Sequence, residues 1–134
     1  MVIDTSAIFA AIANEPDAEV YRRAIKAAPV KLISAQTLLE TRIVLFSRLG
    51  AGALDIFERL IESAGILVIP LDDELSYAAF EAFRRFGKGQ TARARLNIVD
   101  CAAYALARQR NLPLLFKGDD FAATDVVGAL TRRQ

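Results

Sequence analysis

Short apolar runs alternate with longer segments of helical periodicity along this chain. The runs are rich in β-branched residues and are bounded by turn residues, which is typical of buried strands. We expect strands at residues 2–3, 30–33, 66–69 and 114–116, and 126–127 is a candidate fifth strand. Strands that are apolar on both faces and separated by helices form a parallel sheet covered on both sides. The sequence therefore predicts an α/β fold, a three-layer α/β/α sandwich with a mostly parallel central sheet.

The segments between these strands have the spacing and end signals of helices. Thr5 or Ser6 is expected to cap the helix that follows the first strand, and Ser34 the helix that follows the second. Gly50 and Gly52 are expected to end that second helix. Besides the helix after residues 2–3, the predicted helices cover residues 15–27, 35–48, 54–64, 73–86 and 100–109.

The composition excludes several kinds of chemistry. The chain has no histidine, which excludes histidine acid–base catalysis, Ser-His-Asp triads and histidine-ligated zinc. Its single cysteine, Cys101, cannot form an intramolecular disulfide and fits a reducing compartment. The 17 basic and 16 acidic residues balance, so bulk charge neither favours nor opposes nucleic acid. Any chemistry must therefore come from oxygen ligands.

Length and hydrophobic content bear on domain organisation and on partners. The 134 residues fit one domain, and 54% of them are apolar, so we expect part of that excess to cover a partner surface. Asp4 interrupts the apolar start and no basic segment precedes it, so no targeting segment is expected. The uncharged runs are too short to span a bilayer. We expect a cytoplasmic protein with no membrane association that forms an oligomer or a complex.

Acidic residues from separate segments are predicted to meet at one end of the sheet. Asp4 ends the first strand, and Asp119 and Asp120 follow the fourth. Ligands of parallel sheets bind beyond these strand ends. Glu40 and Asp100 lie near helix starts on the sheet-facing side. Singly, each acid has an ordinary interpretation as a cap, a helix-dipole partner or a turn residue. Together they need cations to neutralise them, because burying ionised carboxylates is costly, and this indicates a metal site.

A basic stretch without acidic residues precedes the segment of Asp100. Such a stretch can follow a phosphate backbone, which makes it a candidate RNA-binding surface. The alternative is an ordinary solvated helix end and loop. The members of this basic stretch are Arg84, Arg85, Lys88, Arg93 and Arg95.

Four motifs carry a family resemblance over nearly the whole chain. They are MVIDTSA at residues 1–7, LLET at 38–41, RLNIVDC at 95–101 and PLLFKGDDF at 113–121. In this order and spacing they resemble PIN-domain ribonucleases, specifically VapC-type toxins of bacterial toxin–antitoxin (VapBC) pairs. The resemblance implies a single PIN domain over residues 1–134, a metal-dependent endoribonuclease activity and inhibition by a cognate VapB-like antitoxin. With an RNA substrate and that antitoxin as partners, a homodimer or a higher toxin–antitoxin assembly is expected.

The resemblance also assigns roles by position. It implies four acidic ligands and three supporting residues: Asp4, Glu40, Asp100 and Asp119, with Ser6, Asn97 and Asp120 in support. The choice of Asp119 over Asp120 stays open, because family alignments shift by one residue there. Val99 stands where many relatives have glycine.

An all-oxygen ligand set favours Mg²⁺, with Mn²⁺ as the alternative. One or two such ions would activate a water for in-line attack on phosphorus, leaving a 5′-phosphate and a 3′-hydroxyl. Two other function classes remain open. Asp4 could accept a phosphoryl group as nucleophile, although Ser6 occupies the place of a supporting second aspartate. A non-enzymatic RNA- or protein-binding module would keep the fold and lack the chemistry.

Overall fold

A computed structural model describes residues 1–90 and 93–130 of the chain. Within these residues four strands form one sheet in which every pair is parallel, in the order β3–β2–β1–β4. The strands are β1 (Val2–Ile3), β2 (Leu32–Ser34), β3 (Leu67–Ile69) and β4 (Leu114–Leu115). The helices are α1 (Thr5–Ile12), α2 (Ala18–Ala27), α3 (Ala35–Leu49), α4 (Ala51–Ala64), α5 (Asp73–Phe86), α6 (Ile98–Arg110) and the short 3₁₀ helix η1 (Phe121–Ala123). The α/β fold with a parallel central sheet is confirmed.

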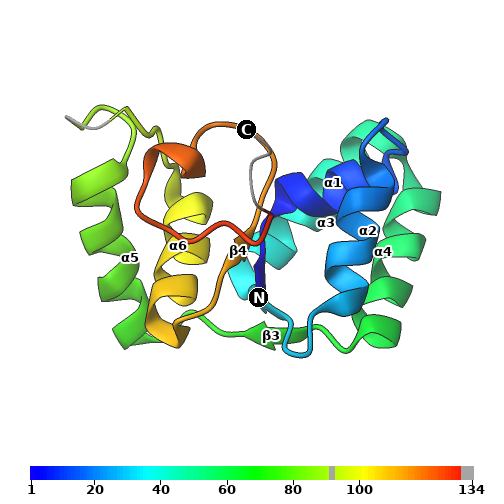
Figure 1. Ribbon diagram of the computed structural model, residues 1–134, viewed down its shortest axis with the longest axis horizontal. Coiled ribbons are helices and arrows are strands. Elements are labelled where there is room, and N and C mark those ends of the chain that lie inside the picture. The colour runs from blue at the N-terminus through cyan, green and yellow to red at the C-terminus, as the bar shows by residue number, and fades with distance from the viewer. Residues whose placement is uncertain (91–92, 131–134) are drawn as a thin grey trace.

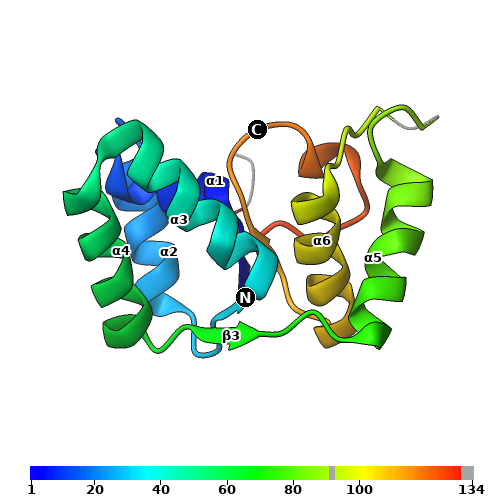
Figure 2. The same ribbon diagram turned by 180° about the vertical axis from the view of Figure 1, so that it is seen from behind.

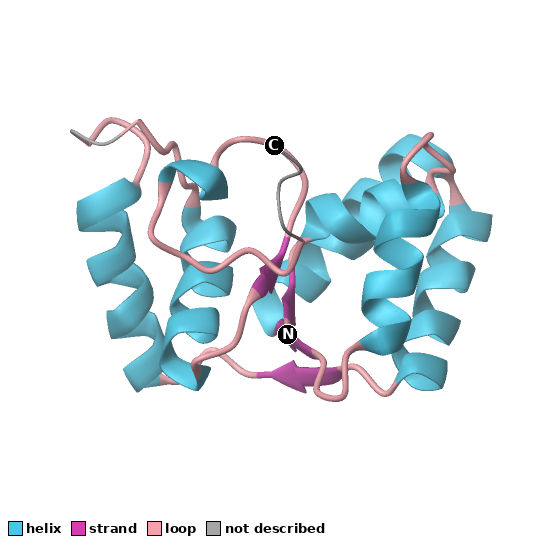
Figure 3. Ribbon diagram, in the orientation of Figure 1, coloured by secondary structure: helices cyan, strands magenta, loops and turns pink. Residues whose placement is uncertain are grey.

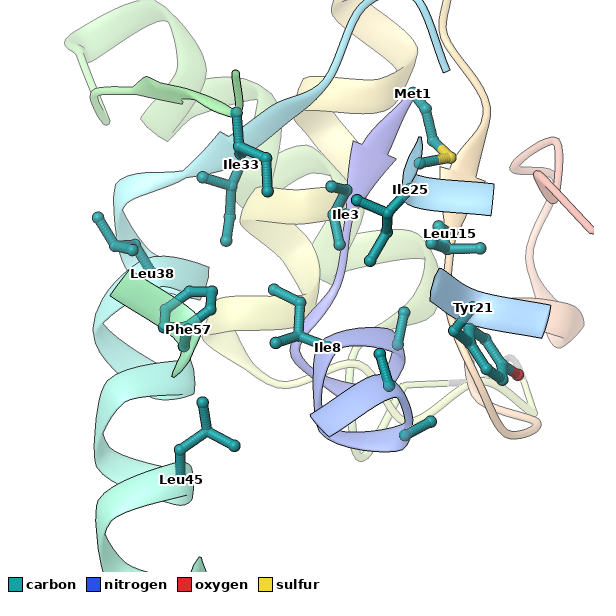
Figure 4. Packing of buried hydrophobic residues seen from close by; sticks show 14 residues of the cluster. Met1, Ile3, Ile8, Tyr21, Ile25, Ile33, Leu38, Leu45, Phe57 and Leu115 are labelled. Carbon is teal, nitrogen blue, oxygen red and sulfur yellow. The ribbon is translucent and has the colours of Figure 1, made fainter. Parts of the chain in front are cut away.

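The sheet separates two hydrophobic cores, as consecutive residues of a strand point to opposite faces. Ile3, Ile33 and Leu115 pack in the core that includes α1 to α4, part of which Figure 4 shows. Val2, Leu32 and Leu114 pack in the second core, with α5 and α6. Figures 1 and 3 show the same arrangement, with the strands between the α1–α4 group and the α5–α6 pair. The chain is thus a three-layer sandwich.

Most helix bounds agree with the sequence, and the differences have local causes. α1 is capped by Asp4 and not by Thr5 or Ser6, because the Asp4 side chain accepts the Ser6 N–H. The second helix begins at Ala18 instead of residue 15, since Asp17 takes the N-cap position after Pro16. Ser34 caps α3 as expected, by accepting the Thr37 N–H.

Two further expectations need correction. Gly50 alone separates α3 from α4, with a φ of +90° that favours glycine, while Gly52 lies inside α4. The candidate fifth strand at residues 126–127 is wrong. There the chain touches the sheet at one point, where Gly128 forms an isolated parallel bridge with Leu114 and Leu114 N–H donates to the Val127 carbonyl at 2.8 Å.

Part of the apolar excess lies at the surface, as the composition predicted. Helix α3 presents an exposed stripe of Leu39, Ile43, Phe46 and Leu49. Leu67 of the edge strand β3 is 61% exposed. In the described part of the chain, no helix is both long and apolar enough to cross a membrane.

Candidate active site

An open cleft with a volume of about 490 Å³ lies where β1 and β4 end. Its walls come from the start of α1, one face of α3, the start of α6 and the turn after β4, segments that meet between the two helix groups in Figures 1 and 2. The ionisable residues of this wall are Asp4, Glu15, Glu40, Asp100 and Asp120 against Arg48 and Lys117. The excess of carboxylates makes this cleft strongly negative. The structure therefore brings three of the four predicted acids together, Asp4, Glu40 and Asp100, and adds Asp120.

Asp4 is buried, with 4% of its surface exposed. Its Oδ2 accepts the backbone N–H of Ser6 at 3.0 Å and the Ser6 hydroxyl at 2.5 Å. The Ser6 Oγ in turn accepts the N–H of Lys117 at 2.9 Å, which ties α1 to the turn after β4. Burial raises the pKa of Asp4 and the charge of Glu40 adds to the rise, although the Ser6 hydrogen bonds oppose it. Ser6 thus binds the carboxylate of Asp4 through both its backbone and its side chain.

The other oxygen of Asp4 has no such support. Within the described residues, Oδ1 is buried without a hydrogen-bond partner. A buried carboxylate oxygen without a donor is costly unless a cation or another charge partner compensates it. Asp4 lines the cleft together with further carboxylates, so this orphaned oxygen fits the chemistry of a divalent metal site.

Asp100 is held at the start of α6 by a reciprocal capping box with Asn97. The Asp100 N–H donates to Asn97 Oδ1 at 2.9 Å, and Asp100 Oδ2 accepts the Asn97 N–H at 3.0 Å. Burial raises the pKa of Asp100 to about 7 against the lowering effect of the Asn97 bond, and repulsion from Asp4, Glu40 and Asp120 contributes. The four acids therefore share one electrostatic environment.

The acids alone do not form a closed cage. Among residues 1–90 and 93–130, no three acidic or cysteine side chains are arranged as a ready-made metal-binding group. Mg²⁺ does not need one, because it keeps several waters and is bound through one or two carboxylates together with substrate phosphate. An ion held here would therefore need water or substrate oxygens to complete its coordination.

The turn after β4 places Asp120 in the cleft, whereas Asp119 is not among the residues that line it. Gly118 has a φ of +107° and redirects the backbone just before the two acids. The Asp119 carbonyl accepts the Ala123 N–H at 3.3 Å, so its backbone belongs to the turn into η1. The sequence favoured Asp119 as the fourth acid of the site, whereas in the structure Asp120 lines the cleft.

The predicted basic stretch is not one surface. Arg84 pairs with Glu81 at 3.2 Å, and Arg85 pairs with Asp125 at 3.1 Å, on the side of α5 and α6. Lys88, Arg93 and Arg95 line a separate hollow of about 490 Å³. In the described chain, none of these five side chains lines the acidic cleft.

Sequence reasoning missed the two cations that do line the cleft. Arg48 follows Glu40 and Val44 at intervals of four residues, so a single face of α3 carries all three into the wall. Lys117 lies two residues after the end of β4, and its Nζ pairs with Glu15 and Asp17 of the loop after α1. The helical spacing from Glu40 was the signal that could have identified Arg48.

Comparisons with known proteins identify the family of this chain and agree with its fold. The family model of the PIN domain matches residues 1–127. The chain is similar to Ribonuclease VapC of Mycolicibacterium smegmatis, with 44% identity over 94% of this chain and 97% of that protein. It is also similar to Ribonuclease VapC28 of Mycobacterium tuberculosis, with 42% identity over 99% of this chain and 100% of that protein.

Solved structures share the fold at lower identity. VapC20 of Mycobacterium tuberculosis, a sarcin–ricin loop cleaving toxin, has a TM-score of 0.78 and 22% identity over 94% of this chain and 95% of its own. A toxin–antitoxin complex from Klebsiella pneumoniae has a TM-score of 0.70 and 18% identity over 96% of this chain and 97% of its own. The chain belongs to the PIN-domain family and, within it, to the VapC ribonuclease toxins.

Proposed function

We propose that this protein is a divalent-metal-dependent endoribonuclease and the toxin of a VapBC pair, with residues 1–134 acting as a single PIN domain in the cytoplasm. The observation that carries the proposal is the buried, unpartnered Oδ1 of Asp4 beside Asp100, whose pKa is raised to about 7 in a cleft of further acids. Such an arrangement is unfavourable without a cation and becomes useful when one is bound.

We assign four acids to the metal and two residues to their support. Asp4, Glu40, Asp100 and Asp120 would hold Mg²⁺, or Mn²⁺ in its place, with Ser6 and Asn97 orienting Asp4 and Asp100. When bound, a divalent ion supplies the charge that activates water for attack on phosphorus and stabilises the leaving oxygen. Because Ser6 holds Oδ2, Asp4 presents its Oδ1 in a fixed orientation. Water as nucleophile predicts products with a 5′-phosphate and a 3′-hydroxyl.

The test is cleavage of total cellular RNA with Mg²⁺, with Mn²⁺ and with a chelator, followed by mapping of the cut ends. We expect cleavage only with metal and at least a hundredfold loss in Asp4→Asn, because each removed carboxylate weakens both binding and charge stabilisation. A purely RNA- or protein-binding module would show no turnover in any condition. An aspartyl-phosphate domain would instead retain phosphate on the protein.

An antitoxin partner fits a second surface of the chain. A groove of about 500 Å³ between α1, α2 and α4 has an apolar floor that includes Ile12, Ile56 and Leu60. Its rim carries Arg22, Arg23, Lys26 and Glu19, so it favours an amphipathic helix with acidic flanks. Helix α1 borders both this groove and the acidic cleft. A basic side chain just after the antitoxin helix could therefore reach the carboxylates.

Two matched substitutions test this part of the proposal. Ile56 lines the groove and is 54% exposed, while Ile43 on α3 is 56% exposed and lies outside it. We expect Ile56→Glu to abolish copurification with the antitoxin encoded beside the toxin, and Ile43→Glu to keep it. Both variants should still cleave RNA. If Ile56→Glu leaves copurification and relief of growth arrest intact, the groove is not the antitoxin site. The expected homodimer or higher assembly stays a prediction, which light scattering can measure.

A further inference from the structure

The two cations of the acidic cleft differ in their partners. Lys117 is neutralised, because its ammonium group pairs with Glu15 and with Asp17, the latter at 3.0 Å. Arg48 forms no ion pair within the described part of the chain. Its guanidinium instead lies over the ring of Phe9, with Cζ 4.4 Å from the ring centroid. Arg48 is therefore the cleft cation whose charge no carboxylate has compensated.

Stacking on Phe9 leaves the guanidinium suitable for an anion. A guanidinium that packs face-on against an aromatic ring keeps its N–H donors directed outward in the plane of the group. That planar fork matches two oxygens of one phosphate, and the bidentate bond is among the stronger charge-assisted hydrogen bonds. Phe9 also limits the rotamers of Arg48, so that less side-chain entropy is lost when an anion binds.

Arg48 lies on the same face of α3 as Glu40, one of the acids of the cleft. Glu40, Val44 and Arg48 follow one face of α3, and eight residues of helix place the Arg48 backbone about 12 Å beyond that of Glu40. Long side chains on a helix lean back toward its N-terminus, which for Arg48 is the direction of Glu40. The guanidinium is thus directed along the cleft wall toward the acids, and no ion pair joins it to them within the described residues.

We propose that Arg48, stacked on Phe9, binds an RNA phosphate next to the one that is cut, so that the strand enters the cleft along the edge between α1 and α3. This inference rests on the proposed ribonuclease function and adds to it the contact that holds the substrate. The cleft wall has five carboxylates and two cations, so an RNA strand meets net repulsion there. One uncompensated arginine provides local attraction for the strand, to which a divalent ion would add when bound.

The experiment measures binding of a short single-stranded RNA of mixed sequence, in Mg²⁺ and over a salt series, to the Asp100→Asn protein. In that background we expect Arg48→Gln to weaken binding about tenfold, as loss of a hydrogen-bonded charge contact does. It should also lower the log–log salt slope by about 0.7, the value for one single-strand phosphate contact. Arg48→Lys should keep the slope but bind more weakly, because charge remains and the fork is lost.

Arg42 provides the matched control on the same helix. It is exposed, paired with Glu58 at 2.6 Å and absent from the cleft wall, so Arg42→Gln should leave affinity and slope unchanged. Equal salt slopes for the Asp100→Asn protein with and without Arg48→Gln would overturn this inference alone, provided that the wild-type protein still cleaves RNA. Arg48-dependent binding without any cleavage by the wild type would contradict the proposed function and retain the phosphate contact. A full parental affinity in Arg48→Lys would overturn the role of the stacked fork.

Discussion

Replacing Asp100 by asparagine is expected to abolish cleavage and yet to stabilise the metal-free fold at neutral pH. Asparagine keeps the volume of the side chain, and its Oδ1 can still accept the N–H of Asn97, so the cap of α6 is preserved. What disappears is a negative charge that burial and the neighbouring acids disfavour. The same charge is the one that a metal would require.

The sign of the effect follows from the raised pKa of Asp100, which is about 7 in the fold and ordinarily 3.8 for an aspartic acid side chain. Below about pH 4 the carboxyl group is protonated in both the folded and the unfolded chain, so the variant has no advantage there. Between these two pKa values the unfolded chain ionises first, which lowers the stability of the wild type as pH rises. Above about pH 7 the whole penalty is present, and Asp100→Asn removes it.

The size of the effect is bounded by the shift. Raising the pKa of Asp100 from 3.8 to about 7 corresponds to at most about 4 kcal/mol, at 1.36 kcal/mol per unit. Because the side chain is partly exposed and water screens it, we expect about 1–2 kcal/mol. For a chain of this length, that is a rise in Tm of about 3–10 °C.

Thermal and urea unfolding with a chelator present, across about pH 4 to pH 8, measure this difference. Asp55→Asn is the control, since Asp55 is an exposed acid of α4 outside the cleft and its removal changes the net charge equally. We expect a gain for Asp100→Asn that is absent near pH 4 and complete near pH 8, and no comparable trend for Asp55→Asn. A constant difference across this range, or a destabilised Asp100→Asn at pH 8, would refute the reasoning.

Four further substitutions test other parts of the site and fold. Asp120→Asn should reduce cleavage at least tenfold while Asp119→Asn retains most of it, because Asp120 lines the cleft; equal losses in a cleavage assay would contradict this placement. Ser6→Ala removes the hydroxyl that donates to the carboxylate of Asp4 at 2.5 Å, so a Mg²⁺ titration of activity should show a higher half-maximal concentration; an unchanged titration would argue against a supporting role. Phe57→Ala should cost about 3–5 kcal/mol in urea unfolding, since Phe57 is fully buried against α1 and α3, and a loss below about 1 kcal/mol would contradict that packing.

Much of the layered fold and part of the site could be predicted from the sequence, because both depend on periodicity. Apolar strands alternating with helices require a covered parallel sheet, and that requirement fixes which strand ends meet. Asp4 could be placed because it ends a strand, and Asp100 because it begins a helix on the buried side. These placements depend on local patterns that tertiary packing does not override.

The remaining features depend on backbone conformations and side-chain partners that the sequence does not specify. The turn at Gly118 determines which of the two adjacent acids, Asp119 or Asp120, lines the cleft. The sequence alone does not specify the backbone conformation of this turn. The basic stretch is continuous in sequence but is divided in space, because Arg85 turns to Asp125, forty residues further along the chain. Helical spacing from Glu40 places Arg48 on the cleft face of α3, but its contact with Phe9 joins two helices and is not specified by the sequence.

The claim that this cleft binds a divalent metal is tested most directly by Mn²⁺ binding to the purified protein. Electron paramagnetic resonance monitors this binding as a loss of the free-ion signal. We expect the wild type to bind Mn²⁺ and Mg²⁺ to displace it. Asp4→Asn should bind at least tenfold more weakly, since it removes the negative charge of the carboxylate with the unpartnered Oδ1. Binding near pH 7 should also release protons, because the pKa of Asp100 is raised to about 7. Equal Mn²⁺ affinity in the wild type and in Asp4→Asn, or RNA cleavage by a wild type that binds no metal, would contradict the claim that this cleft is a metal-dependent active site.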